Sequence, residues 1–132
     1  MSENEGETEV MSRVLIADDH MDTRVILRHY FEAMGFEVCE ASNGSEALEC
    51  LRGDRPDAVV LDIQMPQMDG IAVLKAVRAD EELHDIPVLA LSAHALADEV
   101  RNIIAAGADR YLAKPANPKD VVSAVRELIA DQ

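Results

Sequence analysis

The chain has 132 residues, of which 48% are hydrophobic, which is enough for one folded domain with a core and excludes a disordered chain. Twelve Lys and Arg residues against 26 Asp and Glu give a formal net charge of −14, which argues against direct binding to nucleic acid or to an anionic membrane surface. We find neither a signal peptide nor an apolar segment long enough to span a bilayer, and therefore expect a cytoplasmic protein.

The first eleven residues differ from the rest of the chain. They are acidic and lack any periodicity, and glutamates occupy every second position from 3 to 9. Such a segment cannot bury apolar surface, so we predict a flexible N-terminal tail over residues 1–11 and a folded domain over residues 12–132.

From Arg13 onward, short apolar segments alternate with helical patterns. The predicted strands cover residues 13–17, 36–40, 57–62, 86–92 and 110–114. The predicted helices cover residues 20–35, 43–53, 69–80, 97–107 and 117–130. Regular alternation of strands and helices predicts a parallel sheet with helices on both faces.

Local signals place the ends and faces of the first two helices. Gly35 is expected to end the first helix, and Asn43 and Gly53 to begin and end the second. The spacing of Val25, Ile26, Tyr30 and Met34 is that of a helix.

The strand patterns also predict the order of the sheet. Most strands are continuous apolar runs, as expected for strands buried on both sides, whereas residues 36–40 alternate and suit an edge. Right-handed crossovers leave few topologies. We expect an α/β fold, a flavodoxin-like (βα)5 doubly wound five-stranded parallel sheet with strand order 2-1-3-4-5.

Polar residues follow four of the five predicted strands. Asp18 and Asp19 follow the first, Asp62 ends the third, Ser92 ends the fourth and Lys114 ends the fifth. Ligands bind beyond the carboxyl ends of the strands in such sheets, so these side chains are expected to converge. Oxygen-only ligands favour Mg²⁺, Ser92 and Lys114 could stabilise phosphoryl oxygens, and one carboxylate could be a nucleophile that forms an aspartyl phosphate.

The two cysteines show no sign of a functional site. Cys39 falls in a predicted strand and Cys50 in a predicted helix, without the spacing of metal ligands. We expect reduced thiols in packing positions rather than a disulfide.

Four motifs resemble the response regulator receiver domain of two-component signalling over residues 12–130: VLIADDH, VVLDIQMPQMDG, VLALSAHA and YLAKPANP. The resemblance implies that Asp62 accepts a phosphoryl group from a histidine kinase or a histidine phosphotransfer protein. It further implies Mg²⁺, with Mn²⁺ as an alternative, held by Asp19 and Asp62 directly, by Asp18 through water and by the backbone carbonyl of Gln64.

The resemblance also assigns roles around the phosphoryl group. Lys114 and Ser92 would hold the phosphoryl oxygens, and the Lys114–Pro115 bond would be cis. Ser92 and Tyr111 would form a switch that changes the face made by the fourth helix, the fifth strand and the fifth helix, where a downstream protein would bind. The phosphoryl lifetime would be tuned by three flanking positions, Gln64, Ala93 and His94.

The resemblance implies a stand-alone receiver without a DNA-binding output domain. Such a protein is a phosphoacceptor rather than an ordinary enzyme, and slow autodephosphorylation is expected. We expect a monomer or weak dimer that signals by protein contacts or onward phosphotransfer. A haloacid-dehalogenase-type phosphatase is the enzyme alternative, but its nucleophile precedes its acidic pair, and Gln64 stands where its acid–base Asp is needed. A receiver-like scaffold that takes no phosphate is the other alternative.

Overall fold

The computed structural model describes residues 12–93 and 96–131, and within them five parallel strands form one sheet in the order β3-β2-β4-β5-β6. The strands are β2 (Arg13–Ala17), β3 (Glu37–Ala41), β4 (Ala58–Asp62), β5 (Val88–Ser92) and β6 (Arg110–Ala113). Counted along the chain, this is the predicted order 2-1-3-4-5. The predicted tail, residues 1–11, and His94 lie outside the described residues.

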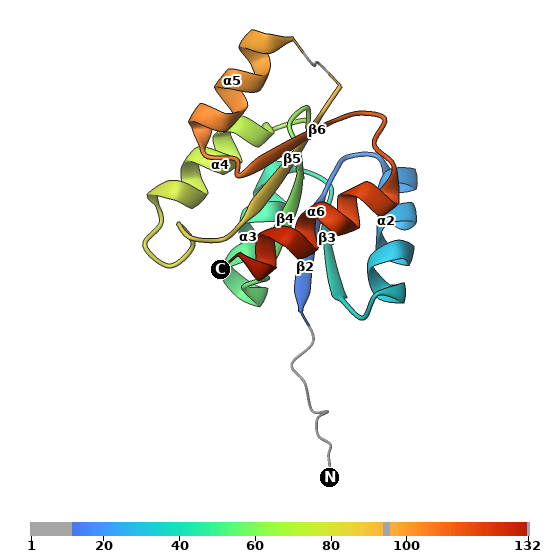
Figure 1. The fold of residues 1–132 in the computed structure, drawn as a ribbon. Coiled ribbons are helices and arrows are strands. Elements are labelled where there is room, and N and C mark those ends of the chain that lie inside the picture. Colours follow the sequence, from blue (N-terminus) through green and yellow to red (C-terminus); the bar gives the residue numbers. More distant parts are fainter. Residues whose placement is uncertain (1–11, 94–95, 132) are drawn as a thin grey trace.

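Helices cover both faces of the sheet, as predicted (Figure 1). They are α2 (Met21–Ala33), α3 (Gly44–Asp54), α4 (Gly70–Ala79), α5 (Ala97–Ala106) and α6 (Pro118–Ala130). One core lies between the sheet and α2 and α6, and a second lies between the sheet and α3, α4 and α5. No helix in the described part of the chain is long and apolar enough to cross a bilayer.

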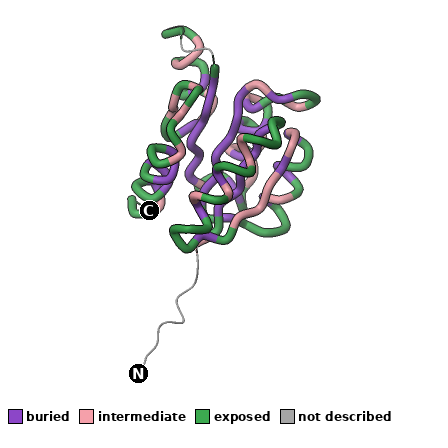
Figure 2. The backbone as a smooth tube through the Cα atoms, turned by 90° about the vertical axis from the view of Figure 1, so that its right-hand side faces the viewer, coloured by how far each residue is buried: buried purple, intermediate pink, exposed green. Residues whose placement is uncertain are grey.

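Burial follows the strand order. Every residue of β4 and β5 is buried, whereas β3 at the edge of the sheet is only partly buried, as its alternating sequence predicts. Figure 2 shows the buried segments running through the centre of the molecule, between helices that are exposed on their outer sides. The carboxyl ends of the central strands β4 and β5 are therefore surrounded by packed side chains.

Side-chain caps hold three helices where they begin, close to the carboxyl ends of the strands. Asn43 accepts a hydrogen bond from the backbone N–H of Glu46 at 2.9 Å, and Asp69 accepts one from Ala72 at 3.0 Å. Asn117 caps α6, whose first residue is Pro118. These caps fix the loops that surround the candidate site.

Most of the apolar residues whose spacing predicted α2 lie outside its buried face. Val25, Ile26 and Met34 are 56%, 48% and 50% exposed, while Leu27 and Phe31 are buried. The helix carries two apolar stripes, and packing of Phe31 edge-on against Phe36, with ring centroids 5.1 Å apart, selects the other one.

The end of α3 also differs from the prediction. Gly53 lies inside the helix, which continues to Asp54. Arg55 follows in the left-handed conformation with φ of 47°, and its N–H bonds the carbonyl of Leu51 at 3.2 Å. A non-glycine residue therefore makes the turn that glycine usually makes.

Candidate functional site

The buried polar residues of the described chain are Asp18, Asp62 and Ser92, at 1%, 1% and 0% exposure. They follow or end β2, β4 and β5, and Lys114 follows β6. The sheet therefore brings the predicted residues to one edge. Burying charged groups is costly unless they have partners or a function, so this edge is the candidate site.

Lys114 joins two of the carboxylates. Its Nζ lies 3.0 Å from Oδ2 of Asp18 and 3.3 Å from Oδ2 of Asp62. Burial, together with the charge of Asp18, raises the pKa of Asp62 to about 6, although Lys114 partly opposes this. Burial alone would lower the pKa of Lys114, but its hydrogen bond to Asp18 and the charges of Asp18 and Asp62 raise it.

The carboxylates form an acidic pocket. Ligand atoms of Asp18, Asp19, His20 and Asp62 all lie within 4.8 Å of one another. The side chain of Asp19 is 30% exposed, which gives solvent access. Among the described residues, Oδ2 of Asp62 is buried and has no hydrogen-bond partner. One ammonium group against three carboxylates leaves excess negative charge, so the pocket fits a hard divalent cation.

Gln64 connects the loops after β4 and β5. Its backbone N–H donates to Oδ1 of Asp62 at 3.1 Å, and its Nε2 donates to Oγ of Ser92 at 2.9 Å. Its Oε1 accepts from the N–H of Ala93 at 3.1 Å. Gln64 therefore holds both the carboxylate and the hydroxyl in place, a tertiary role that its position in the sequence did not indicate.

The loop after β6 is tied to β5. The N–H of Lys114 donates to the carbonyl of Ser92 at 2.9 Å, and the Lys114–Pro115 bond is cis, as expected. Tyr111, on β6, packs against the core beneath α3, α4 and α5. Its hydroxyl is buried without a hydrogen-bond partner among the described residues.

A glycine brings α4 close to Asp62. A Cβ on Gly70 would lie 2.6 Å from Cα of Ile63 and 2.8 Å from the carbonyl oxygen of Asp62, closer than real Cβ atoms come. The first residue of α4 must therefore be glycine for the helix to begin this near the end of β4.

Two residues of the site's rim come from the start of α2. The backbone N–H of His20 donates to Oδ1 of Asp18 at 2.8 Å. Nη1 of Arg24 donates to the carbonyl of Asp18 at 2.8 Å, and its Nε pairs with Glu40 at 2.9 Å. The sequence patterns did not indicate a role for Arg24; a basic residue in the first turn of the helix that follows the acidic pair was the available signal.

An apolar groove of about 520 Å³ borders the site. It lies between the start of α2, the end of β5 and the loop from β6 to α6, and Ile26 and Pro115 are among its lining residues. Lys114 also lines it, so the groove opens beside the acidic pocket.

Comparison with known proteins gives the family. The family model for the response regulator receiver domain matches residues 14–126. The transcriptional regulatory protein PrrA of Mycobacterium tuberculosis is 43% identical over 117 residues, which are 89% of this chain and 49% of PrrA. The chain thus spans about half the length of several curated relatives that it matches.

Other similar proteins have nearly the same length. The polar-differentiation response regulator DivK of Brucella anthropi is 33% identical over 89% of this chain and 96% of DivK. The crystal structure of a response regulator from Chloroflexus aurantiacus is 32% identical, covers 92% of this chain and 99% of its own, and superposes with a TM-score of 0.86. Receiver domains of this kind are phosphoacceptor signalling proteins that bind Mg²⁺ in an acidic pocket. The order of the five strands, the acidic pocket and the family match over most of the length agree with one another. The chain belongs to the response regulator receiver domains of two-component systems.

Proposed function

We propose that Asp62 is the phosphoacceptor, taking a phosphoryl group from a histidine kinase or a histidine phosphotransfer protein. The observation that carries this proposal is the setting of its carboxylate. One oxygen is held by the N–H of Gln64 at 3.1 Å, and the other is buried beside Lys114 without a hydrogen bond. An oriented carboxylate with one oxygen beside an ammonium group and free of hydrogen bonds suits a nucleophile.

The acidic pocket would hold Mg²⁺, with Mn²⁺ as an alternative. Asp19 and Asp62 would be direct ligands, the carbonyl of Gln64 a further one, and Asp18 would act through water. When bound, the cation neutralises negative charge on the phosphoryl oxygens. The carboxylates within 4.8 Å of one another support this assignment.

The transfer step exchanges two bonds at phosphorus. A P–O bond forms to the carboxylate of Asp62 as the P–N bond of the phosphohistidine breaks. The phosphohistidine carries a proton on its other ring nitrogen, so the histidine leaves as neutral imidazole. Asp62 must be ionised to attack, and with a pKa of about 6 most molecules are ionised at neutral pH. Lys114 and Ser92 would then hold phosphoryl oxygens, because charge-assisted hydrogen bonds stabilise the transferred group.

The switch would begin at Ser92. Its Oγ accepts a hydrogen bond from Gln64 at 2.9 Å, and Gln64 in turn binds the N–H of Ala93. Turning Ser92 toward a phosphoryl oxygen would change these bonds and move the following loop. Tyr111 would follow, since its buried hydroxyl lacks a partner among the described residues.

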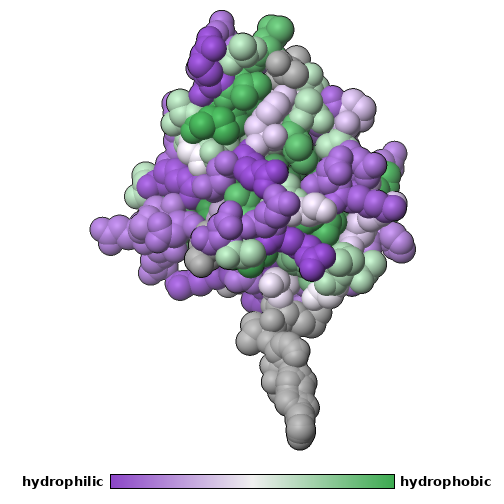
Figure 3. Space-filling model, viewed as in Figure 1, coloured by the Kyte–Doolittle hydropathy of each residue, from purple (hydrophilic) through white to green (hydrophobic). Residues whose placement is uncertain are grey.

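Two exposed apolar surfaces suit the expected partners. Met21, Val25 and Ile26 on α2 are 66%, 56% and 48% exposed and adjoin the groove at the site, where a donor protein would dock. Leu96 and Ile104 at α5 are 72% and 45% exposed, and Figure 3 shows hydrophobic residues gathered over this part of the molecule. A downstream protein would bind the face made by α5, β6 and α6.

The output is proposed to be protein contact or onward phosphotransfer. The match over 96% of DivK supports a receiver acting in this way, and the net charge of −14 argues against direct binding to nucleic acid. Cytoplasmic localisation and a monomeric or weakly dimeric state stay predictions.

The test is incubation with acetyl phosphate, with and without Mg²⁺, read by intact mass. We expect one Mg²⁺-dependent phosphoryl adduct per chain, lost completely in Asp62→Asn. Asp69→Asn is the matched control, because asparagine keeps the cap of α4 and leaves labelling intact. Labelling that persists in Asp62→Asn contradicts the proposal.

The same experiment separates the alternatives. A folded, Mg²⁺-binding chain that takes no phosphoryl group from acetyl phosphate or from a phosphotransfer protein would be a scaffold. Rapid turnover of phosphate monoesters would indicate a phosphatase.

A further inference from the structure

A second group of ligand atoms lies away from the acidic pocket and shares no residue with it. Sγ of Cys39, Sγ of Cys50 and a carboxylate oxygen of Asp54 all lie within 4.8 Å of one another. Cys39 is on the edge strand β3, and Cys50 and Asp54 are on α3, which packs against it. The fold therefore brings together two thiols that are eleven residues apart in the sequence and were expected only to fill space.

Local structure explains how the group is assembled. Cys50 and Asp54 are four residues apart on one helix, so their side chains lie on the same face, one turn apart. Cys39 pairs with Leu15 in the sheet and is held opposite that face. Two donors on one helical turn and a third on a neighbouring strand form a converging arrangement that needs little reorganisation.

Each thiol is within hydrogen-bond distance of a backbone carbonyl. Sγ of Cys39 donates to the carbonyl of Val14 at 3.8 Å, and Sγ of Cys50 donates to the carbonyl of Glu40 at 3.7 Å. Burial, followed by the proximity of Cys50 and Asp54, raises the pKa of Cys39 to about 12. Both thiols are free and only partly buried. Negative charge is thus disfavoured here unless a cation accompanies it.

The group is open to solvent on one side. A groove of about 520 Å³ reaches Cys39 and Asp54 and is lined also by Arg13, Glu32 and Glu37. Arg13 is already paired with Glu37 at 2.6 Å and Glu32 with Arg28 at 2.7 Å, so the negative charge left to the groove is that of Asp54. An entering cation would meet attractive charge at Asp54.

We propose that Cys39, Cys50 and Asp54 form a binding site for a thiophilic divalent cation of the Zn²⁺ class. Two thiolates and one carboxylate are a donor set that Zn²⁺ accepts, with water in the fourth position. Two thiolates on one tetrahedral Zn²⁺ lie about 3.8 Å apart, within the spacing that the cluster already has. Binding replaces two S–H bonds with two metal–sulfur bonds and releases two protons.

This assignment differs from that of the acidic pocket in its chemistry. The pocket of Asp18, Asp19 and Asp62 offers carboxylate oxygens and one imidazole, and it suits hard cations. The cysteine cluster offers sulfur, which Mg²⁺ does not favour. The two sites should therefore load independently, and a thiolate signal reports only the second.

The experiment uses Co²⁺ as the probe, added to the phosphine-reduced 132-residue chain in a large excess of Mg²⁺ that occupies the acidic pocket. We expect one Co²⁺ per chain and a sulfur-to-cobalt charge-transfer absorption, which Zn²⁺ then displaces. Cys39→Ser and Cys50→Ser should abolish the absorption. Asp54→Asn should keep it but weaken affinity at least roughly tenfold, since even outer-shell partners of metal ligands are worth that much.

Controls keep the result interpretable. Asp85→Asn changes an aspartate whose side chain is 86% exposed, elsewhere on the surface, and should bind as the wild type does. Thermal melting by circular dichroism establishes that each variant is folded before titration. Zn²⁺ should raise the melting temperature of the wild type and of Asp85→Asn, but not of Cys39→Ser.

Three results would overturn the proposal. One is the absence of the absorption in the reduced wild type, and another is its survival in both cysteine variants. The third is a reduced chain that forms a Cys39–Cys50 disulfide with a mild thiol oxidant yet takes up no Co²⁺, which would make the cluster a redox pair instead.

Discussion

Lys114 and Arg78 are two half-buried cations at opposite ends of the sheet, with side chains 19% and 24% exposed. Arg78 donates to the carbonyls of Gly107, His84 and Ile86 and pairs with Asp109 at 2.9 Å. Lys114 instead contacts Asp18 and Asp62, with Asp19 close by.

The difference lies in charge balance. Around Arg78 one carboxylate matches one guanidinium, and neutral carbonyls accept the remaining N–H groups, so the charges and hydrogen bonds are satisfied. Around Lys114 three carboxylates surround one ammonium group. The first arrangement stabilises the fold, and the second leaves unbalanced negative charge, which the proposed cation would neutralise and which has some cost in stability.

Arg78→Ala should have the largest effect on stability. It leaves the carbonyls of Gly107 and Ile86 without their donor, and we expect a loss of about 3 kcal/mol in the free energy of unfolding. Urea unfolding measures it, and Arg78→Lys should give an intermediate loss. A loss below about 1 kcal/mol would show that the carbonyls find other donors.

Lys114→Met should have the second largest effect on stability. Without the ammonium group, Asp18 and Asp62 are buried like charges, and we expect a loss of about 2 kcal/mol at pH 7. The loss should shrink at pH 5, because protonating Asp62 removes the repulsion. If Asp62 is phosphorylated in this variant, the phosphorylation should no longer be coupled to the proposed switch at Ser92 and Tyr111. Equal losses at both pH values would contradict this account of the charges.

Asp62→Asn should make the metal-free protein more stable while abolishing phosphorylation. Folding raises the pKa of Asp62 from 3.8 to about 6, so the native state binds its proton more tightly than the unfolded state does. The favourable contribution is complete below pH 4 and is lost as the pH rises through 6. In the presence of a chelator, the variant should therefore gain about 2 kcal/mol over the wild type at pH 7 and little at pH 4.

Asp69→Asn, which leaves the site unchanged, is the control for this pH series. A variant no more stable than the wild type at pH 7 would mean that Lys114 compensates fully for the burial of Asp62.

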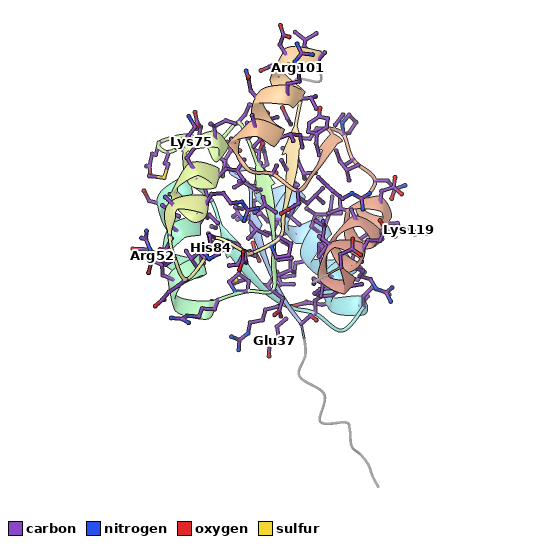
Figure 4. All side chains as sticks on the ribbon, turned by 60° about the vertical axis from the view of Figure 1, so that its left-hand side comes forward. Glu37, Arg52, Lys75, His84, Arg101 and Lys119 are labelled. Atoms are coloured by element: carbon purple, nitrogen blue, oxygen red, sulfur yellow. The ribbon has the colours of Figure 1, made fainter. Side chains whose placement is uncertain are left out.

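Loss of an exposed ion pair should have the smallest effect on stability. Glu82→Gln removes the partner of Arg55, whose Nη2 lies 2.7 Å from Oε1 of Glu82, but the two side chains are 64% and 67% exposed. We expect a change in unfolding free energy within about 0.5 kcal/mol. The charged side chains labelled in Figure 4 also lie on the outside of the fold, where water screens them. Urea unfolding of Glu82→Gln, measured alongside Arg78→Ala, compares the two changes in unfolding free energy directly.

Sequence patterns predicted the elements and the site better than the helix faces. The segments that end at Asp62 and Ser92 are apolar up to those residues. In a chain that alternates strands and helices, such a segment indicates a strand that is buried on both faces of the sheet. On α2, by contrast, Val25 and Ile26, whose spacing predicted the helix, are exposed, whereas Leu27 and Phe31 are buried. Two apolar stripes on one helix look equivalent until a partner such as Phe36 selects one.

The amino-acid sequence by itself determined the strands, the helix caps at Asn43 and Asn117, and the polar residues at the strand ends, Asp18, Asp62, Ser92 and Lys114, because periodicity, capping and strand ends are local properties. Only the tertiary structure decided the role of Gln64 between Asp62 and Ser92, the contact of Arg24 with Asp18, and the meeting of Cys39 with Cys50. The contact of Gln64 depends on β4 and β5 lying side by side. The other two contacts depend on how far α2 and α3 approach the sheet, and that distance is set by the packing of many side chains together.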